Sequence, residues 1–281
     1  MAVNNFSFTF LGTGTSAGVP IIACDCDVCK SDDPRDKRLR CGACIRFTDK
    51  DGVNRVILID TSPDLRQQVL REKIERCDAI LFTHQHVDHT FGLDEVRRFN
   101  MVMKQAIDIY AEQETLGHLH RVFNHVFESN KNVNDSFVAN LIPNEIRPEE
   151  PLNLFGLWIT PIRLFHGRLP ILGFIIHPKL DESSTPRPPT GERSGIGYLT
   201  DVSTIPPESM IQIGRLKTLI LDMLRFRHHP THLNLDQALQ IALSVGAEKT
   251  FFIHMTHDIS HAKIEQELPE GIHLAYDGLT L

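Results

Sequence analysis

The sequence predicts a single α/β domain built from layers of strands and helices, and three observations support this fold class. The chain has 281 residues, a length at which α/β and layered β architectures commonly form one unit. Short apolar runs of strand length recur along it. Between them lie segments with apolar residues at helical spacing and no composition shift that would divide the chain. We therefore expect residues 1–281 to form one domain.

The first predicted element is a strand at residues 6–11, where Phe6, Phe8 and Phe10 recur with a period of two. It ends at the glycine-rich segment 12–18. A glycine loop after a strand is also typical of a dinucleotide site. Here a cysteine-rich loop follows instead of an amphipathic helix whose N-terminus could hold a pyrophosphate. We therefore expect the glycines to let the backbone pass close to a site.

A hairpin and a helix are predicted next. The segments 44–48 and 55–60 flank a turn at Asp51-Gly52, as expected of paired strands. Ser62-Pro63-Asp64 then has the composition of a helix N-cap, first position and acidic first turn. The apolar stripe of this helix consists of Leu65, Val69, Leu70 and Ile74.

Further apolar runs predict mostly strands, and they are 79–83, 157–165, 173–177, 196–200, 217–221 and 250–253. Helical spacing returns in Leu235, Leu239, Ala242 and Leu243, with Gly246 as the expected stop. The polar segment 112–150 predicts a helix followed by irregular chain. A Ser-, Thr- and Pro-rich stretch at about 181–195 predicts a flexible insertion and not a domain boundary.

Composition and charge limit the classes of function. Apolar residues make up 41% and charged residues 23%, as in ordinary globular proteins. The net charge of −7 opposes binding of a polyanion, so long nucleic acid is not an expected partner. The N-terminus lacks the features of a signal peptide, and no apolar run approaches the ~20 residues of a spanning helix. We expect a cytoplasmic protein without membrane contact, and a homodimer is compatible with the sequence.

The densest group of metal-binding donors follows the apolar run 79–82 directly. Residues 83–89 read Thr-His-Gln-His-Val-Asp-His, so four donors fall within six positions. Imidazole mixed with carboxylate suits Zn, Mn or Fe, and this set is expected for metal-dependent hydrolysis. The donors are His84, His86, Asp88 and His89.

Three later residues stand where apolar runs stop, namely His166, Asp201 and His254. If the strands run parallel, their ends bring these side chains into the crevice that holds the 84–89 loop. Asp60, also at a strand end, is expected to orient a ligand and not to bind metal.

The 83–89 motif, followed by Gly92-Leu93, resembles the H-x-H-x-D-H signature of the metallo-β-lactamase superfamily. The resemblance spans nearly the whole chain and implies an αββα sandwich, with two mixed sheets flanked by helices. It also implies a dinuclear centre in which Asp201 bridges the two ions. The implied metal ligands are His84, His86, Asp88, His89, His166, Asp201 and His254.

A second metal signature is Cys24-Asp25-Cys26-Asp27-Val28-Cys29, in a cysteine-rich loop at 24–44 that holds five of the six cysteines. Closely spaced thiolates chelate zinc, and a closed four-ligand site is structural. Cys41 and Cys44 are local candidates for the fourth donor. Within the superfamily the chain most resembles the PhnP-like phosphodiesterases, whose cysteine loop binds zinc with a His three residues after the last active-site His. That resemblance implies Cys24, Cys26, Cys29 and His257, with Cys41 as the alternative to His257.

The same resemblance implies a general acid, a His located 22 positions before the last active-site His. His232 stands at that separation from His254. His228 and His229 are rival choices, since the stretch that holds them is longer than the family's pattern.

These features predict a metal-dependent hydrolase with two active-site divalent ions, Zn, Mn or Fe, and one structural Zn. Two ions about 3.5–4 Å apart can share a hydroxide whose parent water has its pKa lowered toward ~7. We expect that hydroxide to attack a small cyclic or nucleotide-type phosphodiester, with Asp201 bridging the ions and His232 protonating the leaving alkoxide. Two alternatives stay open. One is another enzyme of this fold (a tRNA-processing nuclease, thioesterase or lactonase), and the other is a non-catalytic, metal-stabilised accessory protein.

Overall fold

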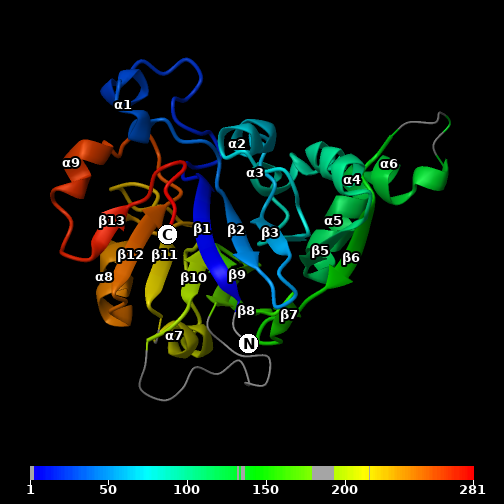
Figure 1. Ribbon diagram of the computed structural model, residues 1–281. Coiled ribbons are helices and arrows are strands. Elements are labelled where there is room, and N and C mark those ends of the chain that lie inside the picture. Colours follow the sequence, from blue (N-terminus) through cyan, green and yellow to red (C-terminus); the bar gives the residue numbers. More distant parts are fainter. Residues whose placement is uncertain (1–2, 132, 134–136, 179–192, 215) are drawn as a thin grey trace.

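Two β-sheets form the centre of the molecule. The computed structural model describes residues 3–131, 133, 137–178, 193–214 and 216–281 (Figure 1). The first sheet has the strand order β1-β2-β3-β4-β5-β6, and the second has the order β13-β12-β11-β10-β9-β8-β7. The predicted insertion at about 181–195 falls largely outside the described residues.

The first sheet begins with an antiparallel meander and continues with parallel strands. β1 pairs with β2 and β2 with β3 in antiparallel register, which confirms the predicted opening strand and hairpin. β3 to β6 then run parallel to one another. The strands are β1 (Asn4–Gly12), β2 (Gly42–Thr48), β3 (Asn54–Ile59), β4 (Ala79–Leu81), β5 (Ile107–Ala111) and β6 (Leu141–Glu145).

The second sheet is also mixed. Its strands are β7 (Leu152–Leu154), β8 (Leu157–His166), β9 (Leu169–His177), β10 (Ile196–Leu199), β11 (Thr218–Asp222), β12 (Lys249–Ile253) and β13 (Ile272–Leu274). β8 and β10 are both antiparallel to β9, while β10, β11 and β12 are parallel. The C-terminal ends of β8, β10, β11 and β12 therefore lie at one edge of the sheet. Every apolar run predicted as a strand forms one.

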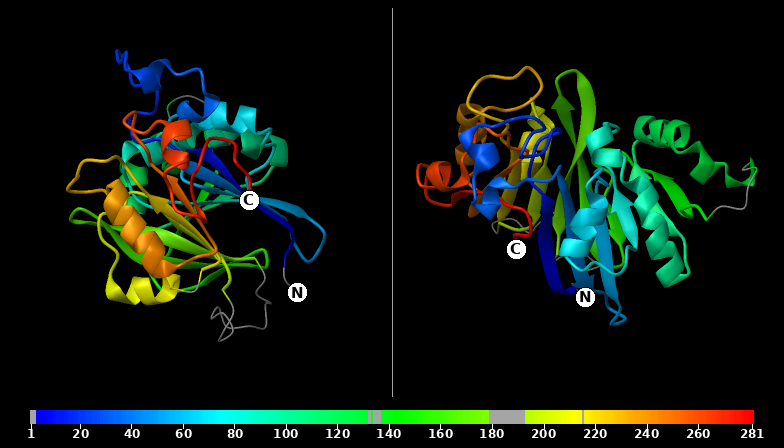
Figure 2. Two further views of the ribbon diagram at one scale, coloured as in Figure 1. Left: turned by 90° about the vertical axis from the view of Figure 1, so that its left-hand side faces the viewer. Right: turned by 90° about the horizontal axis from the view of Figure 1, so that it is seen from above.

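Helices cover the outer faces of both sheets (Figure 2). The longer ones are α2 (Leu65–Arg71), α4 (Arg97–Met103) and α5 (Gln113–Val122) on the first sheet, and α7 (Pro207–Ile213), α8 (Leu235–Val245) and α9 (His261–Glu265) on the second. The short ones are α1 (Asp27–Lys30), α3 (Val87–Thr90), α6 (Asn124–Phe127) and the 3-10 turns η1 (Pro34–Asp36), η2 (Leu93–Val96) and η3 (Ser129–Lys131).

Three apolar cores hold these four layers together. One lies between the sheets and contains Phe8, Phe10 and Tyr198. The other two lie under the helices of each outer face. Burial of apolar surface on both faces of each sheet is what fixes the layers. The fold is the αββα sandwich that the sequence predicts.

Both ends of α8 are capped, and its stop at Gly246 was predicted. Asn234 and Gln237 form a reciprocal capping box at its start, which satisfies two otherwise unpaired amides. Gly246 ends the helix in the left-handed conformation at φ 60°. The helix therefore holds the preceding loop, 225–234, at a defined place.

The predicted start of α2 is wrong. The helix begins at Leu65, so Ser62 lies two residues before the N-cap position, and its hydroxyl accepts from the Asp64 amide in the turn that precedes the helix. Asp64 occupies the N-cap position without capping, since its carboxylate binds the backbone amide and guanidinium of Arg40. Within 112–150 the helix is confirmed, but β6 was not predicted.

In the described ranges, no helix combines the length and apolar character needed to cross a bilayer.

The glycines after β1 make a close backbone approach, as predicted. An added Cβ at Gly12 would overlap the carbonyl oxygen of Arg40, and one at Gly14 would lie 2.8 Å from that of Arg38. Gly14 also bridges to Met255, directly after His254. The glycine loop therefore packs against the segment that carries a predicted ligand.

Candidate active site

The predicted donors meet where strands of both sheets end. The 84–89 loop follows β4, and His166, Asp201 and His254 lie at or directly after the ends of β8, β10 and β12. One ligand atom each from Asp88, His89, Asp201 and His254 lies within 4.8 Å of all the others. Residues 166 positions apart in the sequence thus converge on one point.

A second group of imidazoles adjoins this point. The ring centroid of His86 lies 4.6 Å from that of His84 and 5.1 Å from that of His166, and the His84 and His166 centroids are 5.8 Å apart. His84 and His166 are buried, whereas His86 is exposed. Asp201 lies between the groups, because one of its oxygens also lies within 4.8 Å of ring nitrogens of His166 and His232.

Three site residues have a left-handed backbone one or two residues after a strand ends. Their φ angles are 61° for Asp60, 58° for Asp201 and 63° for His254. This conformation costs a non-glycine residue of order 1 kcal/mol, and such residues cluster at functional sites. The turn at each strand end directs the side chain into the crevice.

Asp60 fixes the protonation pattern of two histidines. Its Oδ2 accepts from the Thr83 hydroxyl at 2.8 Å and lies 2.8 Å from Nδ1 of His89, which must donate to it. With its proton given to Asp60, the Thr83 hydroxyl can only accept from Nδ1 of His84, 3.0 Å away. In the neutral form of each ring the lone pair is therefore on Nε2, which is the nitrogen a metal ion would bind.

The other buried histidines are held in a similar way. Nδ1 of His166 donates to the Thr231 carbonyl at 2.8 Å. Nδ1 of His232 is hydrogen-bonded to Oδ1 of Asp222 at 3.2 Å, and Nδ1 of His254 lies 3.2 Å from the same oxygen as an ion-pair partner, without hydrogen-bond geometry. The Leu233 amide donates to the other oxygen of Asp222. In each ring Nε2 is left for the crevice.

Asp222 is a site residue that the sequence analysis missed. It is fully buried and lies at the end of β11, beside His232 and His254. It stands where the apolar run 217–221 stops, which is the signal that identified the other strand-end residues. The same rule, applied to every strand end, would have found it.

Charges within the crevice control its protonation. Burial opposes the charged form of Asp201, but His254 and His89 lower its pKa well below the usual value. Burial lowers the pKa of His254, but Asp201 and Asp222 raise it to about 9. Burial and the neighbouring His89 lower the pKa of His84 well below its usual value. Burial opposes the charged form of His89, but Asp201 and Asp60 raise its pKa well above the usual value. Without a cation, protons on Nε2 of His89 and His254 thus balance the carboxylates, and a bound cation would take the place of these protons.

The donor set fits metal ions better than it fits a hydrogen-bonded network. Nε2 of His84, His89 and His254 are all buried and make no hydrogen bond, although Nε2 of His89 lies 3.1 Å and that of His254 3.2 Å from Asp201 oxygens. Orphaned buried nitrogens are costly, and a cation between them would remove this cost. Imidazole and carboxylate are the ligands that Zn, Mn and Fe accept.

The cysteine loop forms a separate cluster. Nδ1 of His257 lies 3.1, 3.4 and 3.6 Å from the sulfurs of Cys24, Cys26 and Cys29. The Cys29 amide, at the start of α1, lowers the pKa of the Cys26 thiol to about 7. Of the two fourth donors considered, the structure brings His257 to the thiols.

Cys41 and Cys44 lie elsewhere. Both are buried, Cys41 in the core between the sheets and Cys44 under the helices of the first sheet. Burial raises the pKa of the Cys44 thiol to about 12, so it stays protonated and apolar in character.

Among the three candidate acids, only His232 contacts the donors. Its ring stacks on His254 at 4.6 Å and meets the edge of His166 at 4.5 Å. His229 lies one ring further out, 5.2 Å from His232, and His228 is exposed. The geometry favours the assignment that the sequence made.

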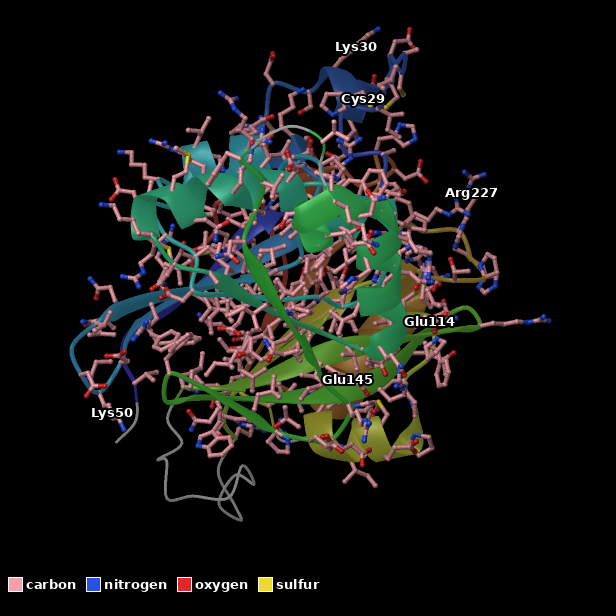
Figure 3. All side chains as sticks on the ribbon, turned by 90° about the vertical axis from the view of Figure 1, so that its right-hand side faces the viewer. Cys29, Lys30, Lys50, Glu114, Glu145 and Arg227 are labelled. Atoms are coloured by element: carbon pink, nitrogen blue, oxygen red, sulfur yellow. The ribbon has the colours of Figure 1, made fainter. Side chains whose placement is uncertain are left out.

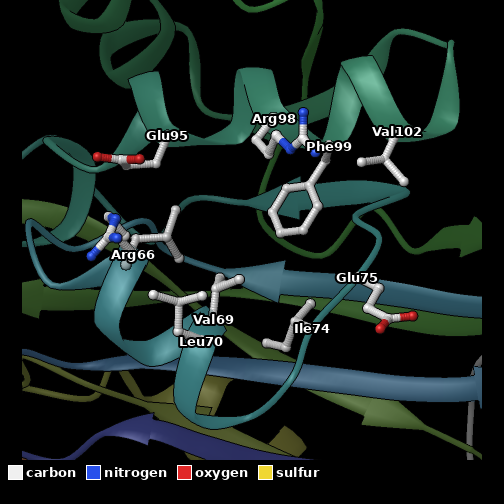
Figure 4. Close-up of a pocket in the computed structure, with 10 residues that line it drawn as sticks. Arg66, Val69, Leu70, Ile74, Glu75, Glu95, Arg98, Phe99 and Val102 are labelled. Carbon is white, nitrogen blue, oxygen red and sulfur yellow. The ribbon is translucent and has the colours of Figure 1, made fainter.

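A polar cavity of about 540 Å³ opens beside His232 and includes His228 and His229. A second cavity, of about 460 Å³, lies between α2 and α4 (Figure 4). Its lining is mainly apolar, with Leu65, Val69 and Phe99, and it contains none of the predicted site residues. The first cavity is therefore the one that belongs to the site.

Comparison with known proteins places the chain in a family. Residues 55–255 match the model of the beta-lactamase superfamily domain. An octanoyltransferase of Porphyromonas gingivalis is 36% identical over 274 residues, 96% of this chain but only 50% of the relative. The chain thus spans half the length of that relative.

Solved structures agree with this placement. The crystal structure of a diphosphatase from the PhnP family is 38% identical and superposes with a TM-score of 0.83, covering 98% of this chain and 96% of the other. Zinc-bound PqqB from Methylobacterium extorquens, at 18% identity and a TM-score of 0.73 over 98% and 99% of the two chains, shares the fold. The chain therefore belongs to the metallo-β-lactamase superfamily and is a hydrolase that resembles the PhnP family.

Proposed function

We propose that the chain hydrolyses small phosphodiesters with two divalent ions in this crevice. His84, His86 and His166 would hold one ion, and Asp88, His89 and His254 the other, with Asp201 shared. The observation that carries the proposal is the convergence of these donors with their free Nε2 atoms, and His232 beside them. When bound, two such ions supply a hydroxide nucleophile at neutral pH and neutralise charge that develops on phosphate oxygens.

His232 would protonate the leaving oxygen. Its Nδ1 lies 3.2 Å from the buried Asp222 carboxylate, which holds the ring in place. A proton on Nε2 would then be directed toward the crevice, where the oxygen of the leaving group receives it. Asp222 acts on His232 through this contact and does not itself meet the substrate.

A second candidate is hydrolysis of a diphosphate linkage. It is favoured by one observation, the 38% identity to a protein described as a diphosphatase over nearly the full length of both chains. Both reactions use water to cleave a P–O bond and need the same donors. We do not assign octanoyl transfer to this chain, because the chain spans only half of the relative that is named an octanoyltransferase.

The net charge and the unpaired cysteines bear on the partners and the compartment of the protein. The net charge of −7 favours small substrates over long nucleic acid. All six cysteines are unpaired with one another, which suits a reducing compartment, and we propose the cytoplasm.

Metal analysis combined with turnover tests the proposal. Purified protein resupplied separately with Zn, Mn and Fe should bind three metals per chain and hydrolyse bis(p-nitrophenyl) phosphate. A chain that holds one metal and hydrolyses neither this compound nor a diphosphate would be an accessory protein instead. Turnover of lactones or thioesters alone would favour the other enzymes of this fold.

Substitution of His232 tests the acid. His232→Ala should lower kcat by about 10²-fold or more for an alkyl phosphodiester, which leaves poorly without a proton, and far less for the nitrophenyl ester. His120→Ala provides the control, since His120 is exposed on α5 and belongs neither to the donors nor to the lining of the cavity beside His232. Equal losses on the two esters would remove the acid role.

A further inference from the structure

Arg38 is a buried charge that belongs to neither donor cluster. Its side chain is fully buried, and its two terminal nitrogens donate to Asp36 at 2.9 Å and to the carbonyls of Thr256 and Ile259 at 3.0 and 2.7 Å. A buried guanidinium is costly unless its charge is paired and its donors are satisfied. The two carbonyls are therefore part of what stabilises Arg38 in the folded chain.

These carbonyls lie on the segment 254–261, which supplies one histidine to each cluster. His254 of the crevice begins the segment, directly after β12. Thr256 directly precedes His257 of the cysteine cluster, and Ile259 follows it by two positions. The guanidinium therefore holds the backbone on both sides of the cysteine-cluster histidine and shortly after the crevice histidine.

Asp36 binds the same segment near its end. Its Oδ1 accepts from Nη2 of Arg38 at 2.9 Å and from the His261 amide at 2.8 Å. Asp36 and Arg38 lie on the loop 24–44 that carries the three thiols, and this loop lies beside the segment that leads to α9 (Figure 1). The loop thus meets the segment 254–261 twice, once through the cysteine cluster and once through the Asp36–Arg38 pair.

The glycine-rich segment 12–18 makes room for Arg38. A Cβ at Gly14 would lie 2.9 Å from Cβ of Arg38 and 2.8 Å from its carbonyl oxygen. The backbones of Val19 and Arg38 exchange two hydrogen bonds, at 2.8 and 2.7 Å. A side chain at position 14 would displace the backbone that these bonds hold, and with it the guanidinium.

We propose that Arg38, paired with Asp36, is a positioning residue for the segment 254–261, so that the metal affinities of His254 and His257 both depend on it. The part that concerns His254 rests on the proposed function. The planar guanidinium carries several donors in a fixed arrangement, so it reaches two separate carbonyls and a carboxylate at once. Arg38 acts through these backbone contacts and not through contact with metal or substrate.

Cobalt binding by Arg38→Met tests the proposal. Methionine keeps an apolar side chain but removes the charge and its hydrogen bonds. Thiolate-bound Co²⁺ has a charge-transfer band that Co²⁺ bound by His and Asp lacks, so the two clusters can be followed separately in one protein. In competition with EDTA, the variant should bind the cysteine-bound ion and the crevice ion held by His254 about tenfold or more weakly.

The other crevice ion provides an internal comparison. Its proposed ligands His84, His86 and His166 lie outside the segment 254–261, so its affinity should be retained. A general loss of stability would weaken all three ions alike. Selective loss of two ions is therefore the result that a positioning role predicts and a merely structural role does not.

Amide hydrogen exchange gives a second measurement on the metal-loaded protein. Residues 256–261 should exchange faster in Arg38→Met than in the wild type, because the bonds that fix this segment are lost. Arg35→Met is the matched control, since in the described structure the Arg35 guanidinium pairs with Asp33 in its own loop. The control should change neither the exchange of this segment nor any of the three affinities.

If Arg38→Met does not fold, Arg38→Lys replaces it. Lysine keeps a positive charge for Asp36 but lacks the planar fork that engages two carbonyls. It should weaken the same two ions by a smaller factor, about threefold, and leave the third unchanged. Wild-type affinities in Arg38→Lys would then overturn the proposal.

Two results with Arg38→Met would also overturn it. One is equal weakening of all three ions, which would make the contribution of Arg38 one of overall stability. The other is unchanged affinity at both clusters. The proposed function fails separately: a wild-type chain that binds three ions but hydrolyses no phosphate substrate would remove that function and leave the positioning role standing.

Discussion

The two donor clusters of this molecule differ in how their histidines are held. In the crevice, Asp60, Asp222 and the Thr231 carbonyl each occupy the far side of an imidazole. The cysteine cluster has four donors around one point, and Nδ1 of His257 faces all three sulfurs. The first arrangement orients many ligands around an open site, whereas the second closes one.

One loop connects the two clusters. His254 follows β12 and His257 follows three residues later, so a single segment carries a donor for each. Figure 3 shows Cys29 on an excursion at the edge of the molecule, away from the sheets. A metal in the cysteine cluster would tie this excursion to the segment that positions His254. We therefore propose that the closed cluster stabilises the fold and that the open one carries the reaction.

The largest expected effect comes from the shared carboxylate. Asp201→Ala should lower kcat/KM by about a thousandfold, because both ions lose a ligand and their Lewis-acid contribution is worth several kcal/mol. Metal analysis should show loss of the crevice metals with retention of the cysteine-bound one. Asp258→Ala, an exposed carboxylate on the His257 loop, is the control and should change neither measurement. Full activity of Asp201→Ala would contradict the ligand assignment.

The next largest effect is a loss of stability when the cysteine cluster is disrupted. Cys26→Ser should remove one metal per chain and destabilise the fold by about 2–3 kcal/mol, or roughly 5 °C in Tm. Cys77→Ala, which removes a buried thiol outside the cluster, should lower Tm without changing the metal count. If Cys26→Ser kept three metals per chain, the cysteines would not form a site.

A smaller effect should follow from replacing Asp60, whose carboxylate orients His84 and His89. Asp60→Asn keeps the size of the side chain but removes the charge that holds the protons on His89 and Thr83. We expect metal affinity of the crevice to fall about 10–100-fold, as measured by competition with a chelator. The cysteine-bound metal should be unaffected. Unchanged affinity in the crevice would show that Asp60 is not needed to orient its ligands.

The smallest effect concerns a histidine outside both clusters. Burial lowers the pKa of His177 to about 4, below the unfolded value near 6.5. Between these values the unfolded chain binds more protons, so stability is lost as pH falls, by about 1.4 kcal/mol per pH unit. His177→Gln should flatten this slope in urea unfolding at pH 6.5 and 5.5. An unaltered slope would assign the acid sensitivity to other groups, such as the clusters themselves.

The sequence predicted where the strands and the candidate donors lie, but it did not predict how the histidine rings are oriented. Apolar runs marked where strands stop, and parallel pairing then brought His166, Asp201 and His254 to one edge. The tautomers set by Asp60 and Asp222 depend on contacts between residues as far as 32 positions apart, which no local pattern encodes. The start of α2 failed for a similar reason, because Arg40 engages the carboxylate of Asp64.

The left-handed strand ends at positions 60, 201 and 254 have a consequence for directed evolution. Glycine adopts this backbone freely, so each replacement by glycine would relieve local strain of order 1 kcal/mol. At position 60 this gain is outweighed, because glycine would leave the Thr83 amide and Nδ1 of His89 without their acceptor. Even a library sorted only for heat resistance should therefore keep Asp60. Each of the three strained turns directs a side chain into the crevice, and this orientation is what the strain maintains.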